Sequence, residues 1–219
     1  VQALLARAYT SLPMGHLQCT IIDPEGLGRD FAWLMPLADI DPKLVGHRVW
    51  TQSHQIAEQL ALLVYQTEDT IQQRLRDRYS DLAAYNAEAG PMAEPLRLVV
   101  WPHFPVGLDE AAWRSLCALA AAGPRCGIGI LLTIDHGQAW PPFADPEKLM
   151  GQALRLNLNS PVHVVGGELE RFPLTLAEPP SLEQLRQLMV YCAQAAAEAG
   201  RLEVPFESIQ LAPSEIGQG

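Results

Sequence analysis

Three side chains that could handle protons or bind a metal follow predicted strands: Asp23, His103 and Asp135. Each comes at or near the carboxyl end of a short apolar segment, and such segments are typical of buried strands. If the strands are parallel, these ends meet at one edge, where open α/β sheets bind ligands. An imidazole with two carboxylates would suit a metal-dependent hydrolase, because a bound metal activates water and the acids transfer protons.

The same residues also have a purely structural interpretation. Asp23 directly precedes Pro24-Glu25-Gly26, so its carboxylate can accept backbone N–H groups of that bend as an Asx-turn. Asp135 and His136 would be polar caps where a strand meets a loop, and His103 would be a surface turn residue. Strand ends are commonly polar in proteins whether or not they are catalytic, so the sequence favours this interpretation.

The elements that must position these residues alternate along the chain. Predicted strands over residues 16–23, 96–101 and 127–135 are separated by helical patterns, a long one over 53–82 that can break near Ser80, and a second over 109–122. A helix over 1–11 precedes them. This alternation predicts an α/β fold in which a mostly parallel sheet is flanked by helices.

The sequence after residue 135 predicts short strands and one further helix. Short strands are expected over 154–158, 162–165 and 172–176, with Gly166-Gly167 turning a hairpin between the last two. Ser181 is the expected cap of a helix that runs to Ala199. We therefore expect a single domain over residues 1–200 and an extended linker over 201–219.

Bulk composition narrows the possible partners and compartment. The chain has 219 residues, a net charge of −10 and only 15 Lys plus Arg, so its average surface repels nucleic acid and anionic membrane. Its four cysteines are scattered without a C-x-x-C pair, which favours free thiols in a reducing cytoplasm. We expect a cytoplasmic protein without a membrane segment, and, because it starts inside a helical pattern, a fragment of a longer one.

Several segments, in order, are similar to those of a known family. Thr20-Ile21-Ile22-Asp23-Pro24-Glu25-Gly26 resembles the "IDP" strand end of the FtsK/SpoIIIE family of hexameric DNA-translocating ATPases. Tyr85-Asn86 resembles its "YN" pair, and Val204-Pro205-Phe206 resembles its linker to a further ATPase module. The resemblance covers residues 1–135 and implies a RecA-like P-loop NTPase core, with Thr133 in the position of the family's sensor threonine.

The departures from that family bear on activity. The chain contains no G-x-x-x-x-G-K-[ST] loop to hold phosphates, since neither Lys43 nor Lys148 follows a glycine. The family places Asp-Glu after the strand that corresponds to 96–101, whereas this chain has Pro102 and His103. Neither residue replaces a carboxylate on Mg²⁺, which prefers oxygen ligands.

The resemblance and its departures together predict a degenerate module with no catalytic residue that stands out. It would serve assembly with other ATPase modules of its parent protein, in a possible homo-oligomer that reaches DNA only as a larger assembly. Two alternatives stay open. ATP and Mg²⁺ would be its ligands if a P-loop lies upstream of Val1, and a metal-dependent hydrolase would use Asp23, His103 and Asp135.

Overall fold

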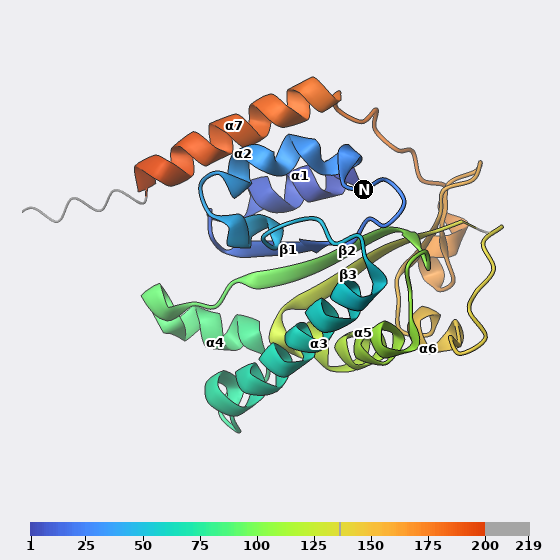
Figure 1. Ribbon diagram of the computed structural model, residues 1–219, viewed down its shortest axis with the longest axis horizontal. Coiled ribbons are helices and arrows are strands. Elements are labelled where there is room, and N and C mark those ends of the chain that lie inside the picture. The colour runs from blue at the N-terminus through green and yellow to red at the C-terminus, as the bar shows by residue number, and fades with distance from the viewer. Residues whose placement is uncertain (136, 200–219) are drawn as a thin grey trace, which may run out of the picture.

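The computed structural model, which describes residues 1–135 and 137–199, has a sheet of three parallel strands between two layers of helices (Figure 1). The strands lie side by side in chain order: β1 (Leu17–Ile21), β2 (Leu96–Phe104) and β3 (Ile128–Ile134). All three predicted strands are therefore present, and the predicted α/β architecture with a parallel sheet is confirmed.

One face of the sheet is covered by α3 (Ser53–Asp69) and α5 (Glu110–Ala122), which lead from β1 to β2 and from β2 to β3 (Figure 1). Two successive crossovers on the same face are what right-handed connections produce. Their core contains Val99, Trp101 and Leu116, all fully buried. This layer packs under the end of β2, the strand end at which the resembled family has acidic residues.

The opposite face carries α1 (Gln2–Ser11), α2 (Met35–Ala38) and α7 (Leu182–Ala199) (Figure 1). Two 3₁₀ turns, η1 (Arg29–Leu34) and η2 (Pro42–Val45), complete this layer. The predicted cap of α7 is confirmed: the Gln184 N–H donates to Ser181 Oγ at 3.3 Å, and the Ser181 N–H donates to Gln184 Oε1 at 2.8 Å. Among the described residues, no helix has the length and apolar content needed to cross a bilayer.

The predicted long helix over 53–82 breaks near Ser80 as expected, but it also changes character earlier, at Thr70. α3 ends at Asp69 and passes into a π-helical turn, η3 (Thr70–Leu75), and a separate helix, α4 (Leu82–Ala89), follows. The Thr70 hydroxyl donates to the Gln66 carbonyl at 2.8 Å, a side-chain bond that competes with regular helical pairing. Asp81 then caps α4 by accepting the Ala84 N–H at 2.9 Å. Helical periodicity does not reveal the change to a π-helical turn at Thr70.

A small antiparallel hairpin follows α6 (Glu147–Met150), as predicted, but with different strands. β4 (Arg155–Asn157) pairs with β5 (His163–Val165), so the chain reverses before Gly166-Gly167. Asn157 starts this reversal by accepting the Asn159 N–H at 2.9 Å. The two glycines lead instead into the 3₁₀ turn η6 (Glu168–Arg171). The predicted strand over 172–176 is reduced to an isolated bridge between His163 and Pro173, and the predicted linker over 201–219 lies outside the described residues.

Candidate functional site

Asp23, at the carboxyl end of β1, is used to hold a turn. Its side chain is 1% exposed, and its two oxygens accept the N–H groups of Gly26 at 2.8 Å and Gly28 at 2.9 Å. A Cβ on Gly26 would lie 2.5 Å from Oδ2, so the bend requires glycine there. Asp23 thus holds the Pro24-Glu25-Gly26 bend as predicted, although its donors lie three and five residues on and not two as in an Asx-turn, and each carboxylate oxygen accepts a backbone N–H.

Backbone bonds fix the position of this turn at the sheet edge. The Asp23 N–H donates to the Trp50 carbonyl at 2.9 Å, and the Trp50 N–H donates to the Ile21 carbonyl at 2.8 Å. These bonds form a short parallel bridge between Ile22 and Trp50. Gly28 has a φ of 80° and packs against Val49, which closes the turn over the same segment.

The end of β2 differs from the prediction, because the strand continues past Trp101 to Phe104. The register to β3 shifts between these two residues, and Phe104 resumes pairing opposite Ile134. His103 lies inside the irregularity with a φ of 57°, a left-handed conformation that is uncommon for residues other than glycine. Its N–H turns toward β3 and donates to Thr133 Oγ1 at 3.3 Å. Residues 102 and 103 are therefore part of a bulged strand.

The bulge directs Phe104 into an aromatic cluster beneath the sheet edge. Phe104 is fully buried, with edge-to-face contacts to Trp101 at 5.1 Å and to Trp140 at 5.3 Å between ring centroids. Trp113 meets Trp140 in the same manner at 6.2 Å. The Trp101 Nε1–H donates to the Val106 carbonyl at 3.1 Å. The strand end that carries acids in the family is filled here by hydrophobic packing.

The structure brings His103 together with Glu25 and Thr133. Nδ1 of His103 lies 3.8 Å from Oε2 of Glu25, and both side chains are about half exposed, at 48% and 60%. Thr133 contributes its hydroxyl to the His103 backbone. Sequence reasoning identified His103 and Thr133 separately and passed over Glu25 as part of a bend. No local pattern links them, because the contacts cross from β1 to β2 to β3.

Asp135 caps the loop after β3 and lies exposed at that edge. Its Oδ1 accepts the Gly137 N–H at 3.0 Å. In the part of the chain that the structure describes, no three His, Cys, Asp or Glu side chains are grouped to hold a metal. Each oxygen of Asp23 already accepts a backbone N–H, and His103 offers nitrogen, whereas Mg²⁺ takes oxygen ligands. The residues at this edge therefore do not fit a magnesium ion.

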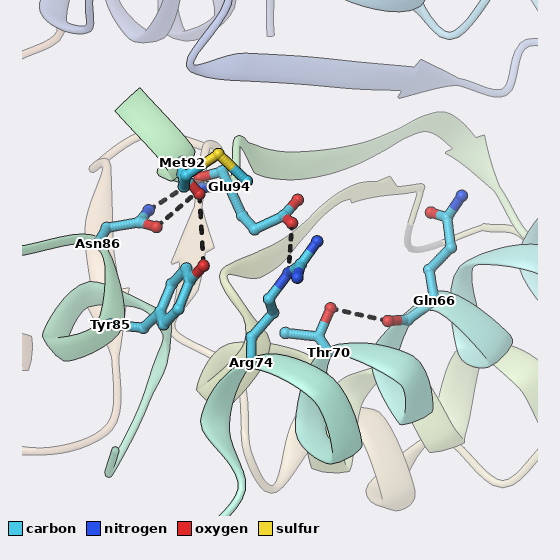
Figure 2. Close-up of polar contacts among 7 residues, drawn as sticks. All are labelled: Gln66, Thr70, Arg74, Tyr85, Asn86, Met92 and Glu94. Atoms are coloured by element: carbon cyan, nitrogen blue, oxygen red, sulfur yellow. Dashed lines mark hydrogen bonds and ion pairs between the residues drawn. The ribbon is translucent and has the colours of Figure 1, made fainter. Parts of the chain in front are cut away.

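A second polar cluster, at the amino end of β2, contains the Tyr85-Asn86 pair (Figure 2). Asn86 bonds to both backbone groups of Glu94: its Nδ2 donates to the carbonyl at 2.8 Å and its Oδ1 accepts the N–H at 2.9 Å. Arg74 Nε donates to the Glu94 carboxylate at 2.7 Å, and the Tyr85 hydroxyl lies 3.4 Å from the Met92 carbonyl. This α4 clamp has a structural role, since it holds α4 and η3 to the start of β2.

Replacing Asn86 with alanine is expected to lower the free energy of unfolding by about 2 kcal/mol, because both backbone groups of Glu94 lose their partner. Chemical denaturation measures the loss, and hydrogen exchange should quicken in α4 before the rest of the chain. Glu88→Ala is the matched control on the same helix. It breaks an exposed pair with Arg78 at 2.8 Å and an exposed bond that the Tyr79 hydroxyl donates to the same oxygen at 2.9 Å, and should cost less than about 1 kcal/mol. Equal effects of the two substitutions would rule out the clamp.

The chain is similar to known proteins in its structure, although no match to it is found by sequence. No protein-family model and no curated protein matches the chain. The cytoplasmic domain of EssC aligns with a TM-score of 0.63 and 16% identity, over 90% of this chain and 42% of that one. EssC (ATPases 2 and 3) from Geobacillus thermodenitrificans gives 0.61 and 16%, over 90% and 41%. EccC (ATPases 2 and 3) from Thermomonospora curvata, in complex with a signal sequence peptide, gives 0.54 and 18%, over 90% and 39%.

This chain spans less than half the length of each of those structures. At these identities the likeness concerns the fold. Together with the parallel sheet and its flanking helices, it confirms that the chain has the α/β fold of P-loop ATPase domains.

Proposed function

We propose that this chain is a degenerate FtsK/SpoIIIE-like ATPase module that keeps the fold, does not hydrolyse ATP and serves assembly. Its role is to pack against other ATPase modules of a larger cytoplasmic translocase-like protein. The similar EssC and EccC structures each contain more than one ATPase, which supports a modular parent. With a net charge of −10, the module contacts DNA only through that assembly.

The end of β2 is the observation that carries this proposal. An ATPase of this fold needs carboxylates near the γ-phosphate to organise Mg²⁺ and water. Here the strand ends in Pro102-His103-Phe104, and the buried Phe104 ring packs against Trp101 and Trp140. The neighbouring acid, Asp23, is committed to its turn. Nucleotide binding and ATP hydrolysis use different groups. The proposal therefore states that hydrolysis is lost and makes no statement about nucleotide binding.

One observation favours the alternative that a phosphate-binding loop precedes Val1. Nε2 of Gln2 donates to the Asp30 carbonyl at 2.9 Å, which ties the first turn of α1 to the segment just after the Asp23 turn. The start of α1 thus lies at the same edge of the sheet as the Asp23 turn. In P-loop proteins, phosphates are bound there by the loop and by the amino end of the helix that follows it. A G-x-x-x-x-G-K-[ST] sequence directly before Val1 in the parent gene supports this alternative, and its absence removes it.

Phosphate release from the chain in the presence of Mg²⁺ and ATP is the experiment that tests the main proposal. We expect release at the rate of the protein-free control, because the described residues group no set of side chains that could hold the metal, and both oxygens of Asp23 already accept backbone N–H groups.

A further inference from the structure

We propose that the junction between α3 and α4, residues 70–81, is a strained hinge. In the closed form that the structure shows, the α4 clamp holds Arg76 in an unfavourable backbone conformation. In the open form, α4 and η3 have left Glu94 and that conformation relaxes. This proposal concerns the mobility of α4 and does not depend on whether the module hydrolyses ATP.

Arg76 has a backbone conformation that belongs to glycine. Its φ of 47° and ψ of −143°, with a bond from the Arg78 N–H to the Leu75 carbonyl at 3.1 Å, are close to the first central position of a type II′ turn. The chain uses glycine for a similar conformation at the end of α4, where Gly90 has a φ of 54° and a ψ of −122°. For a residue with a Cβ, this conformation costs free energy.

The π-helical turn η3 leads the chain into this conformation. The Arg76 N–H donates at 2.8 Å to the carbonyl of Ile71, five residues back, whereas an α-helix spans four. Leu75, the last residue of η3, is fully buried and fixes the turn to the core. The chain must therefore reverse sharply directly after Leu75 to reach α4. Turns of the π type are frequent at functional sites in proteins.

Both ends of the junction are tied to one residue, Glu94, at the start of β2 (Figure 2). Its carboxylate accepts Arg74 Nε of η3 at 2.7 Å, and its backbone groups bond to the Asn86 amide of α4 at 2.8 and 2.9 Å. Arg125 holds the middle, because its Nε donates to the Ser80 carbonyl at 2.7 Å. A segment fixed at three points cannot shift to relieve a mismatch, so the strain stays in its backbone.

Opening of the clamp releases this strain. Once α4 and η3 leave Glu94, the junction is no longer held at both ends, and Arg76 can adopt an ordinary conformation. The strain raises the free energy of the closed form alone, so it lowers the free energy needed to move α4. A partner that draws α4 away from β2 therefore needs less binding free energy than the hydrogen bonds of the clamp alone would require.

Native-state hydrogen exchange on the 219-residue chain measures the opening of α4. Arg76→Gly stabilises the closed form, so exchange of the α4 amides should slow about fivefold. Arg76→Ala keeps a Cβ and the strain, and should leave that exchange unchanged. Gln73→Gly is the matched glycine control: Gln73 is exposed, lies in η3 and has no positive φ, so this substitution should not slow exchange.

A double-mutant cycle with Asn86→Ala tests whether the clamp is the source of the strain. In the wild-type background, Arg76→Gly should lower the equilibrium constant of unfolding about fivefold. In the Asn86→Ala background the same substitution should lower it less than about twofold, because one end of the junction is already released. In an Asp135→Ala background, at the opposite end of the sheet, the effect should again be about fivefold.

Two results would overturn the proposal. The first is an equal effect of Arg76→Gly with and without Asn86, which would make the strain independent of the clamp. The second is exchange in α4 that Arg76→Gly leaves as fast as in the wild type.

Discussion

Replacing Asp23 with alanine is expected to lower the free energy of unfolding by about 3 kcal/mol. The carboxylate accepts two backbone N–H groups in a site that is 1% exposed, and hydrogen bonds to buried charged groups are among the stronger ones. Without it the N–H groups of Gly26 and Gly28 lose their acceptor, and the turn loses its fixed shape. Urea denaturation of the two proteins measures the difference.

Two further substitutions make this prediction specific. Asp23→Asn keeps one side-chain oxygen and the same shape, so it should cost about half as much. Asp135→Ala removes an exposed aspartate that also follows a strand but accepts a single N–H, from Gly137. It should cost less than about 1 kcal/mol. If Asp23→Ala and Asp135→Ala destabilise the chain equally, Asp23 is not the anchor of the β1 turn.

The second large effect is expected at Phe104. Phe104→Ala should lower the free energy of unfolding by about 4 kcal/mol, because a fully buried ring is removed from between Trp101 and Trp140. Denaturation gives the free energy. Tryptophan fluorescence should shift to longer wavelength as water enters around Trp140.

Two controls separate packing from the mere loss of an aromatic ring. Phe104→Leu retains most of the volume and should cost about 1.5 kcal/mol. Phe143→Ala removes a phenylalanine that is 40% exposed, and its effect should stay below about 1 kcal/mol. A small loss at Phe104 would mean that the end of β2 is not organised by the aromatic cluster.

The parts of the fold that depend on local pattern could be predicted from the sequence. Three apolar segments predicted the three parallel strands, and Ser181 predicted the cap of α7. The turn after β1 was readable because Asp23 is followed at once by Pro24-Glu25-Gly26, so the acceptor and its donors lie within a few residues.

The error at the end of β2 comes from a contact between segments distant in sequence. β2 reaches Phe104 because His103 adopts a positive φ and its N–H finds Thr133, thirty residues later. No sequence pattern near residues 102–103 predicts that Thr133 is the partner. The π-helical turn after α3 is a local error of another kind: the apolar periodicity continues through it, while the Thr70 hydroxyl donates to the Gln66 carbonyl four residues earlier.

The sequence indicated the sheet edge at which the candidate residues lie, but neither Glu25 nor the arrangement of the group. Asp23, His103 and Asp135 do lie at the predicted sheet edge, yet each is held by its own turn or strand. The pair that the structure adds, Glu25 with His103, forms only because the β1 turn and the β2 bulge end up side by side. The residue types therefore indicated where the edge lies. The hydrogen bonds to the backbone determine which of its side chains remain available for chemistry.

Phosphate release by the chain with Mg²⁺ and ATP tests most directly whether this fold has lost hydrolysis. The account predicts no release above the protein-free control, and none for Glu25→Gln or Asp135→Asn, the variants of the two exposed acids at the edge. Magnesium-dependent turnover that falls in either variant, while the exposed-charge control Glu88→Ala keeps it, would contradict the account.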